Sequence, residues 1–481
     1  MVKSSERLIK SSYFLILDQA ANYGLGLLFW LIIANILTTT EVGHIMVILA
    51  IMNTILGFSA FGAQTMLSKY ISEFVANNNL SAAKYVLKNG VKLGLIVSLS
   101  TGAILAIFSN NIAMAYNEPS LAPLIILAAI AFLPSHTVMQ SFMGAYNGLH
   151  KMKYTAITTT TFQSLKLVIA ILLIGFGSMG VMAGFTLGSI IAIIIGLSLF
   201  LNKLIKVKSG EVVKGIIKFS GFNYLAIGLN RLTTQVNYIL LGVNGFDSAA
   251  FFGIAALIAG VAGGLSYPIA RALLPTISHE LNQGKKFVII NDVLRLMLIV
   301  SGLVYIVLFV MPEEILSIFS KDYTVATNTL QTLVIASIMS SLSLFIIYVI
   351  NGIGKADIVA KTAMIYAPVS IISSIIFIPI MGIEGAALAM LIGSTINIGL
   401  YVYHLFQFKE LSLSINALTK PTIAIIVVVV IGHLLFSMLN LDTILMLTIL
   451  IGLYIAIIFA TKTTTMAEIR SLIRMIIKVI K

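Results

Sequence analysis

Fourteen apolar runs, each about as long as a membrane-spanning helix, constrain this chain more than any other feature. They fall near 12–37, 42–67, 91–109, 120–146, 154–176, 180–202, 219–242, 248–271, 287–311, 325–350, 358–379, 383–406, 421–439 and 443–461. A helix needs about 20 mostly apolar residues to cross a bilayer, so each run predicts one span. Composition agrees, because 59% of the residues are hydrophobic and 10% are charged. The sequence therefore predicts an all-α polytopic membrane protein with about 14 transmembrane helices.

The same pattern excludes several classes of protein. The loops between the runs are too short to bury a soluble core, so we expect no enzyme activity and no cofactor. The chain has no cysteine, which excludes disulfides, a thiol nucleophile and a thiolate metal site. Its six histidines show no metal-ligand spacing, so no metal site is expected.

The basic residues are distributed unevenly among the loops. With the N-terminus in the cytoplasm, 27 of the 30 Lys and Arg residues fall on that side, whereas the opposite side has Lys321 and eight acids. This is the positive-inside pattern. It predicts a multi-pass protein of the cell membrane with both termini cytoplasmic. The net charge of +13 is then explained by topology and contact with membrane lipids, and no nucleic-acid partner is expected.

Two parts of the chain repeat each other at an offset of about 206 residues. Thr38–Ile51 resembles Gly245–Ile258, and Ala145–Ala156 resembles Val349–Ala360. Each copy has an even number of spans, so we expect two parallel six-helix lobes followed by two C-terminal helices. The predicted parts are an N-lobe at 1–204, a cytoplasmic linker at 205–218, a C-lobe at 219–410, helices 13 and 14 at 411–462, and an amphipathic cytoplasmic tail at 463–481.

Three segments resemble a known family, namely LLPTIS (Leu273–Ser278), NGIGKAD (Asn351–Asp357) and FIPIMGIEGAALA (Phe377–Ala389). They resemble the Wzx-type polysaccharide flippases of the MOP superfamily, which also contains the MurJ lipid II flippases and the MATE drug exporters. The resemblance implies a V-shaped pair of lobes that moves a polyprenyl- or dolichyl-linked sugar by alternating access. Such flippases often carry a basic residue at the outer end of the first helix, where this chain has Ala34-Asn35-Ile36.

Two basic residues lie deep inside predicted spans. Lys166 is about twelve residues into the fifth span and Arg231 about twelve into the seventh, so each lies about 18 Å from the cytoplasmic end. Neither side chain can reach an interface from there, and a charge that faces lipid costs several kcal/mol. We expect both to face a water-filled cavity and to bind an anionic group such as pyrophosphate. The alternative is that Asp18 neutralises one of them.

Polar residues accompany these cations. On the seventh span they form two neighbouring stripes, Asn223, Asn230, Thr234 and Asn237 on one, and Tyr224, Arg231, Gln235 and Tyr238 on the other. On the fourth span, His136 and Gln140 share a face after a kink expected at Pro134, and either contact sugar or bond between helices. Arg271 either guides the headgroup or anchors its helix. The predicted substrate-binding set is Arg231, Lys166, Asn230, Gln235, Asn237, Arg271, His136 and Gln140.

Asp18 is the one acid that we place within the membrane, because Asp292 and Glu384 lie near the ends of their spans and are counted with the loops. Asn22 follows Asp18 on the same face at i+4. A cation-coupled exporter would use this pair as a proton or sodium site. In an anion-accepting cavity the pair would supply a counter-charge, and a structural ion pair is a third possibility.

Small residues recur at every fourth position in two spans. Gly180, Gly184 and Gly188 lie in the sixth span, and Gly260 and Gly264 in the eighth. Both patterns predict close helix packing.

Together these features favour a monomeric flippase that moves a polyprenyl- or dolichyl-(pyro)phosphate-linked oligosaccharide to the outer leaflet. The coupling ion, H⁺ or Na⁺ if one is used, stays open. The alternative is a MATE-like cation-coupled exporter of drugs or small metabolites. Such an exporter should embed more acids than bases, whereas this chain embeds two bases and one acid.

Overall fold

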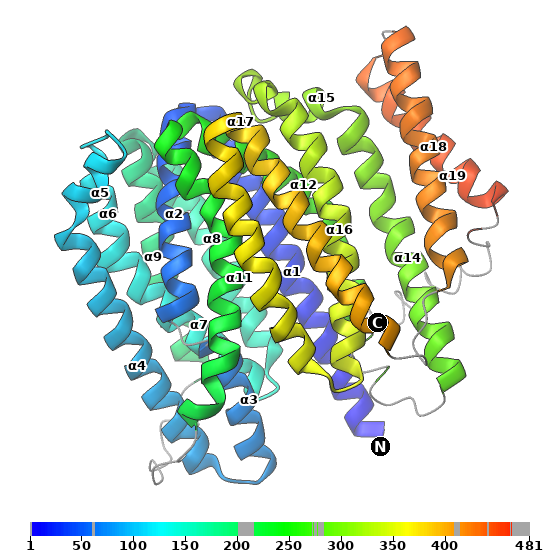
Figure 1. Cartoon of the computed structure of the whole chain (residues 1–481). Coiled ribbons are helices and arrows are strands. Elements are labelled where there is room, and N and C mark those ends of the chain that lie inside the picture. Colours follow the sequence, from blue (N-terminus) through cyan, green and yellow to red (C-terminus); the bar gives the residue numbers. More distant parts are fainter. Residues whose placement is uncertain are drawn as a thin grey trace. The chain divides into compact units, whose positions relative to one another are not determined.

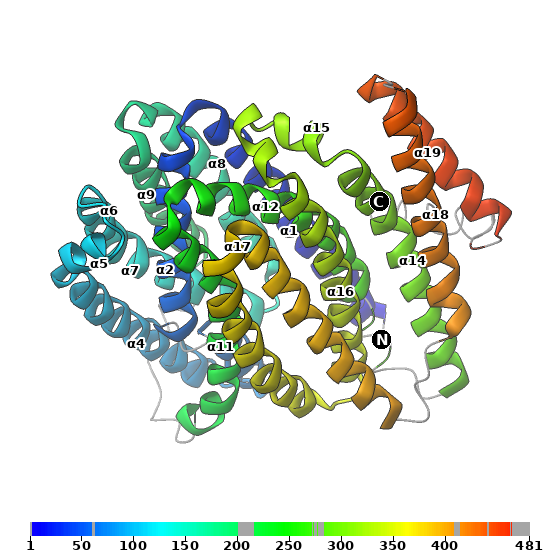
Figure 2. The ribbon, with the colours of Figure 1, turned by 45° about the horizontal axis from the view of Figure 1, so that its top comes forward.

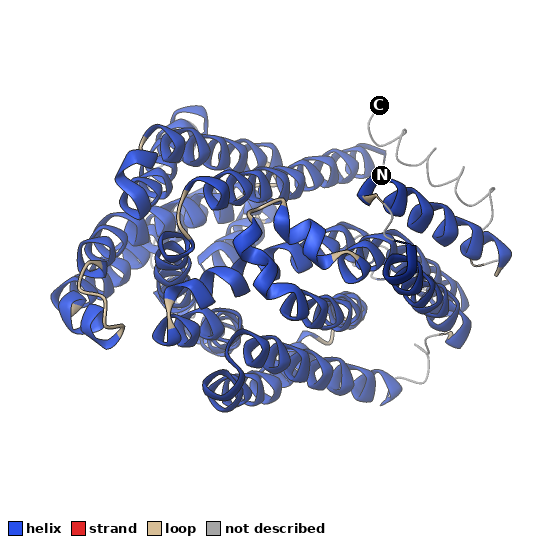
Figure 3. Cartoon of the chain, turned by 90° about the horizontal axis from the view of Figure 1, so that it is seen from above, coloured by secondary structure: helices blue, strands red, loops and turns tan. Residues whose placement is uncertain are grey.

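The computed structural model describes residues 2–59, 63–200, 216–271, 273, 277, 283–407, 414–439, 442–461 and 463. All regular structure in these residues is helical, and Figure 3 shows the helices joined by short loops. Within this part of the chain, twelve helices are long and apolar enough to cross a membrane. The predicted all-α polytopic class is therefore confirmed. The chain divides into two units, Met1–Ala250 and Phe251–Lys481.

The first unit contains most of the helices that carry the predicted site. Its elements are α1 (Val2–Ile36), α2 (Thr39–Ser59), α3 (Ala63–Ala76), α4 (Leu80–Ile107), α5 (Ser109–Ala115), α6 (Leu121–Leu127), the π-helix η1 (Ala128–Phe132), α7 (Leu133–Gly148), α8 (Met152–Leu172), the 3-10 helix η2 (Ile174–Phe176), α9 (Gly177–Phe200) and α11 (Ile216–Asn244). Helix α8 packs against α1 and α9, and α11 packs against α2 (Figure 1).

The second unit contains most of α12 (Phe246–Arg271), followed by α14 (Gln283–Val310), α15 (Pro312–Ser317), the 3-10 helix η3 (Lys321–Ala326), α16 (Thr327–Gly352), α17 (Ala356–Gln407), α18 (Ile415–Leu439) and α19 (Thr443–Ala460). Buried side chains such as Leu294, Phe345 and Tyr401 join α14, α16 and α17. Helices α18 and α19 lie side by side (Figure 2). Their apolar side chains pack on α14.

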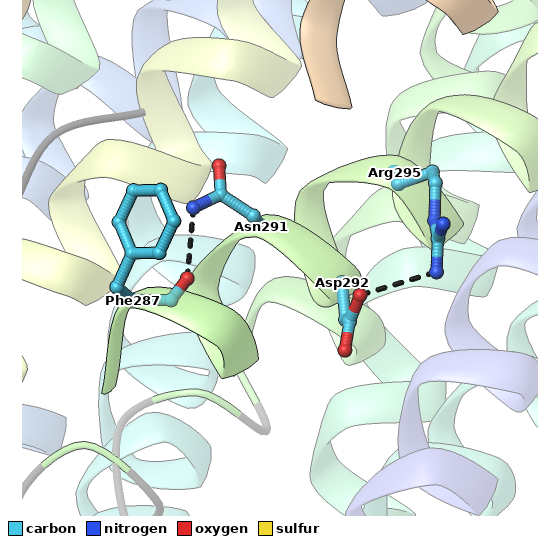
Figure 4. A network of polar contacts seen from close by, with 4 residues as sticks. All are labelled: Phe287, Asn291, Asp292 and Arg295. Atoms are coloured by element: carbon cyan, nitrogen blue, oxygen red, sulfur yellow. Dashed lines mark hydrogen bonds and ion pairs between the residues drawn. The ribbon is translucent and has the colours of Figure 1, made fainter. Parts of the chain in front are cut away.

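A polar contact fixes the start of α18 on α14. Asn291 donates from Nδ2 to the backbone oxygen of Phe287 at 2.8 Å (Figure 4). Its Oδ1 accepts the backbone N–H of Ser414 at 2.6 Å. One position further along, Asp292 forms an ion pair with Arg295 at 3.1 Å (Figure 4).

Most expected spans correspond to one helix or to part of one, whereas the fourth covers α6, η1 and α7. Helix α17 contains two of them, and its backbone leaves the helical region at Gly382, with φ 60° and ψ −128°. This break lies between the spans predicted to end at 379 and to begin at 383. Helix α11 has 29 residues, which is long enough to span a bilayer.

The prediction is wrong at the end of the second span. Helix α2 ends at Ser59, and a separate helix, α3, begins at Ala63. The polar segment that follows is also helical outside its turn at Asn77–Asn79. Asn79 caps α4 by accepting the backbone N–H of Ala82 at 3.0 Å. Hydropathy detects a membrane crossing but misses amphipathic helices beside it, and α3 buries only one face, including Leu67 and Ile71.

A π-helical turn lies directly before Pro134, where a kink is expected. The π-helix η1 ends at Phe132, directly before α7, and Pro134 lies in the first turn of α7. Proline has no amide hydrogen, so it cannot bond to the carbonyl four residues earlier, and a π-helical turn absorbs the interruption.

The glycines of α9 allow close packing, as predicted. A Cβ atom at Gly184 would lie 2.9 Å from the backbone oxygen of Lys166, and one at Gly188 would lie 3.1 Å from the Lys166 backbone nitrogen. At Gly260 no described atom comes within 4 Å of that position, so close packing is a wrong prediction there. The α9 glycines therefore hold the backbone of α8 at Lys166.

Parts of the predicted domain division lie outside the described residues, namely the linker up to residue 215 and the tail from 464 onward. The lobe boundaries stay a prediction.

Candidate functional site

Lys166, in the second half of α8, is enclosed by aromatic rings and is only 4% exposed. Its Nζ lies 4.2 Å from the ring centroid of Phe29, 4.9 Å from that of Phe185 and 5.7 Å from that of Phe162. These distances fall within the cation–π range. The three rings come from α1, α9 and α8, so three helices build the enclosure. Among the described residues, no acid forms an ion pair with Lys166.

A chain of hydrogen bonds leads from Lys166 to α1. Lys166 Nζ donates to Gln163 Oε1 at 2.5 Å, and Gln163 Nε2 donates to Asn22 Oδ1 at 2.6 Å. Gln163 is 6% exposed, whereas Asn22 is exposed. Asp18 lies one turn before Asn22 and is partly buried. The structure thus joins Lys166 to Asn22, two residues to which the sequence assigns different roles.

His136, on α7, lies beside the aromatic enclosure. Its ring centroid is 5.7 Å from that of Phe162, and its Nε2 is 3.3 Å from the Nε2 of Gln140. The charges of Arg231 and Lys166 both act on its ring. Its Nδ1 is buried without a hydrogen-bond partner among the described residues. The structure therefore places His136, Gln140, Lys166 and Arg231 in one neighbourhood.

Arg231, in the middle of α11, has a more open environment. The residue is exposed, and its guanidinium makes no ion pair or hydrogen bond in the described part of the chain. Its stem lies directly on α2, because a Cβ atom at Gly57 would be 2.8 Å from Arg231 Cβ. Thr234 Oγ1 donates to the Arg231 carbonyl at 2.8 Å and accepts from Gln235 Nε2 at 3.2 Å. The backbone at Arg231 is thus held while its charged end stays accessible.

The remaining predicted residues divide between the two units. On α11, Asn230 is exposed and Asn237 is 1% exposed, and both make polar contacts. The side chain of Asn223 lies outside the described residues. Arg271 belongs to the second unit, where its guanidinium lies 5.8 Å from the ring centroid of Tyr267. The ring of Tyr267 in turn makes an edge contact with Tyr348 of α16.

Sequence reasoning missed a polar contact at the start of α2. Thr39 and Thr40 donate from their hydroxyls to the same oxygen of Asp247, at 2.6 and 2.8 Å. Tyr116, whose ring packs on Phe246, donates to the backbone oxygen of Ile239 at 3.2 Å. Burial raises the pKa of Tyr116 to about 12, so its hydroxyl keeps its proton. The internal repeat is the sequence signal that could have indicated this contact. Its two copies start at Thr38 and Gly245, directly beside the contacting residues.

Comparison with known proteins identifies the family. Residues 8–280, more than half of the chain, match the family model described as polysaccharide biosynthesis protein. The chain belongs to the polysaccharide biosynthesis protein family. This agrees with the resemblance seen in the sequence. An uncharacterized membrane protein of Methanocaldococcus jannaschii is 24% identical over 428 residues, which cover 84% of this chain and 99% of that protein.

Solved structures show that this member of the polysaccharide biosynthesis family has the fold of MOP superfamily proteins. It is similar to the lipid II flippase MurJ in an inward closed conformation, with 18% identity and a TM-score of 0.72 over 97% of this chain and 99% of that one. It is also similar to an inward-facing multidrug resistance MATE transporter, with 15% identity and a TM-score of 0.69 over 81% of this chain and 94% of that one.

Proposed function

We propose that this polysaccharide biosynthesis family member is a membrane flippase. It moves a polyprenyl- or dolichyl-(pyro)phosphate-linked oligosaccharide to the outer leaflet by alternating access. The observation that carries the proposal is Arg231, an exposed cation in the middle of a helix of spanning length, without an ion pair among the described residues. A charge at such a depth is costly unless it faces water or a ligand, and it marks a transport pathway.

The chemistry around Arg231 favours an anionic ligand. A guanidinium presents paired N–H donors that match two phosphate oxygens. Lys166 adds a second positive charge, and both charges reach His136. A pyrophosphate headgroup supplies negative charge that matches these two cations.

The membrane potential can supply the driving force. Moving two negative charges outward through an inside-negative potential is favourable by about 4–5 kcal/mol per 100 mV. The sequence has no phosphate-binding loop of the type G-x-x-x-x-G-K-[ST], so the proposal needs no nucleotide.

The test is export of glycan by cells that carry each variant as their only copy, normalised to the amount of protein in the membrane. Arg231→Glu should abolish surface glycan, because it replaces the main donor by a group that repels phosphate. Arg231→Lys should keep part of the export, because it retains the charge but not the paired donors. Lys88→Glu, a change at an exposed residue of α4, is the control. Full export by Arg231→Glu would refute the proposal.

Asp18 separates this proposal from a cation-coupled exporter of drugs or small metabolites. If Asp18 supplies only a counter-charge, Asp18→Asn should keep most of the export. If the protein is cation-coupled, Asp18→Asn should abolish transport while Arg231→Glu leaves it intact.

A further inference from the structure

The chain of hydrogen bonds from Lys166 to Asn22 has a fixed direction. A lysine ammonium can only donate, so the group of Gln163 that meets it must be the carbonyl oxygen. The amide nitrogen of Gln163 then points the other way and needs an acceptor. That acceptor is Asn22 Oδ1 at 2.6 Å. The positive charge on Lys166 thereby fixes the orientation of the side-chain amide of Gln163 and, through it, that of Asn22. We call this chain of hydrogen bonds from Lys166 through Gln163 to Asn22 the relay.

The last member of the chain has a donor left over. With its Oδ1 used by Gln163, Asn22 presents Nδ2, which makes no hydrogen bond in the described part of the chain. Asn22 is exposed, unlike Gln163 and Lys166. Its amide can therefore meet a ligand as a donor through Nδ2.

Lys166 itself is poorly placed to touch a ligand. Three phenylalanine rings and Gln163 occupy the space around its ammonium. Gly184 and Gly188 of α9 pack closely against its backbone. Its influence on a ligand therefore passes through Gln163 to Asn22.

We propose that Lys166 is a positioning residue that fixes Asn22 as a hydrogen-bond donor, and that Asn22 contacts an acceptor oxygen of the transported molecule, on its phosphate or its sugar. The proposal rests on the flippase function. It adds Asn22 as a residue that selects substrates by the position of their acceptor oxygens. Asn22 accordingly determines specificity.

Two substitutions at Gln163 test the direction of the relay. In Gln163→Glu both side-chain oxygens are acceptors, so Asn22 must turn its Nδ2 inward and present Oδ1 to the ligand. Lys166 compensates the new charge. In Gln163→Met the relay is broken, and Asn22 is free to turn either way. Export, normalised to membrane abundance, should fall about tenfold or more in Gln163→Glu and about threefold in Gln163→Met.

This order is the opposite of what a packing role predicts, because glutamate has the shape of glutamine and methionine does not. Lys166→Met also removes the constraint on the orientation of Asn22, so its export should equal that of Gln163→Met. In an Asn22→Ala background, Gln163→Glu and Gln163→Met should show equal export, because the residue that contacts the substrate is missing. A loss in Gln163→Met equal to or larger than that in Gln163→Glu would overturn the proposal.

A binding assay locates the acceptor oxygen. The probe is polyprenyl pyrophosphate without sugar, added to the purified full chain in lipid nanodiscs. Weaker binding in Gln163→Glu places the acceptor on the phosphate, and unchanged binding with lost export places it on the sugar. Unchanged binding together with unchanged export overturns the relay. If the flippase function itself is wrong, Arg231→Glu will show normal export. This result is distinct from the results that test the relay.

Discussion

Lys166 and Arg231 are both cations within long helices of the first unit, but their environments are opposite. Lys166 is enclosed by Phe29, Phe162 and Phe185 and donates to Gln163. Arg231 is exposed, and its guanidinium has no hydrogen-bond or ion-pair partner in the described residues. Equal depth in the sequence pattern therefore does not mean equal function.

The difference separates two ways of keeping a charge inside a membrane protein. The cation of Lys166 is stabilised by ring faces and an amide oxygen, so it holds three helices together. The cation of Arg231 is left for water or a ligand. We infer that Arg231 binds the anionic group directly, while Lys166 acts through its neighbours.

The largest expected effect on stability comes from opening the enclosure. Phe29→Ala removes a ring that is 0% exposed and lies closest to the ammonium. The free energy of unfolding should fall by about 3 kcal/mol, because a cavity replaces a buried ring. Thermal unfolding of the purified protein in detergent measures this. Phe176→Ala, at a residue that is 73% exposed, is the control, and an equal effect there would contradict the enclosure.

A smaller effect is expected at the contact between α9 and Lys166. Gly184→Ala places a methyl group 2.9 Å from the Lys166 backbone oxygen, so the helices must separate. The free energy of unfolding should fall by about 2 kcal/mol. Gly26→Ala, where no described atom lies within 4 Å, should leave it unchanged or raise it. If Gly184→Ala and Gly26→Ala change the free energy of unfolding by the same amount, the α9 glycines do not position α8.

The smallest expected effect concerns Arg231. Gly57→Ala places a methyl group 2.8 Å from Arg231 Cβ and should displace the arginine without unfolding the protein. The affinity for polyprenyl pyrophosphate should fall about threefold, with a smaller loss of stability than in Gly184→Ala. Gly452→Ala, which meets no described atom within 4 Å, is the matched change in the second unit. An unaltered affinity in Gly57→Ala would show that Gly57 does not position Arg231 for ligand binding.

The fold follows from the sequence where hydropathy decides it. The helices and the break at Gly382 were predictable, because apolar runs and an I-P-x-x-G-I pattern mark them. The separate helix α3 was not, because Ala63–Ala76 joins an apolar run to a polar one and its partners come from elsewhere in the chain.

The candidate site was predictable only in part. Lys166 and Arg231 stand out because a charge within an apolar run is rare. The phenylalanines around Lys166 resemble every other apolar residue, and only the packing of α1, α8 and α9 brings them together. The bond between Gln163 and Asn22 joins positions 141 residues apart, and no local pattern signals it.

Binding of polyprenyl pyrophosphate to the purified chain in lipid nanodiscs tests the contrast between the two cations most directly. Arg231→Ala should weaken binding at least about tenfold, because a charged ligand loses its charge-assisted donor. Lys166→Met should weaken it about threefold or less, because this cation reaches the ligand only through Gln163 and Asn22. A loss in Lys166→Met as large as that in Arg231→Ala would contradict the account and make the enclosed lysine the ligand-binding cation.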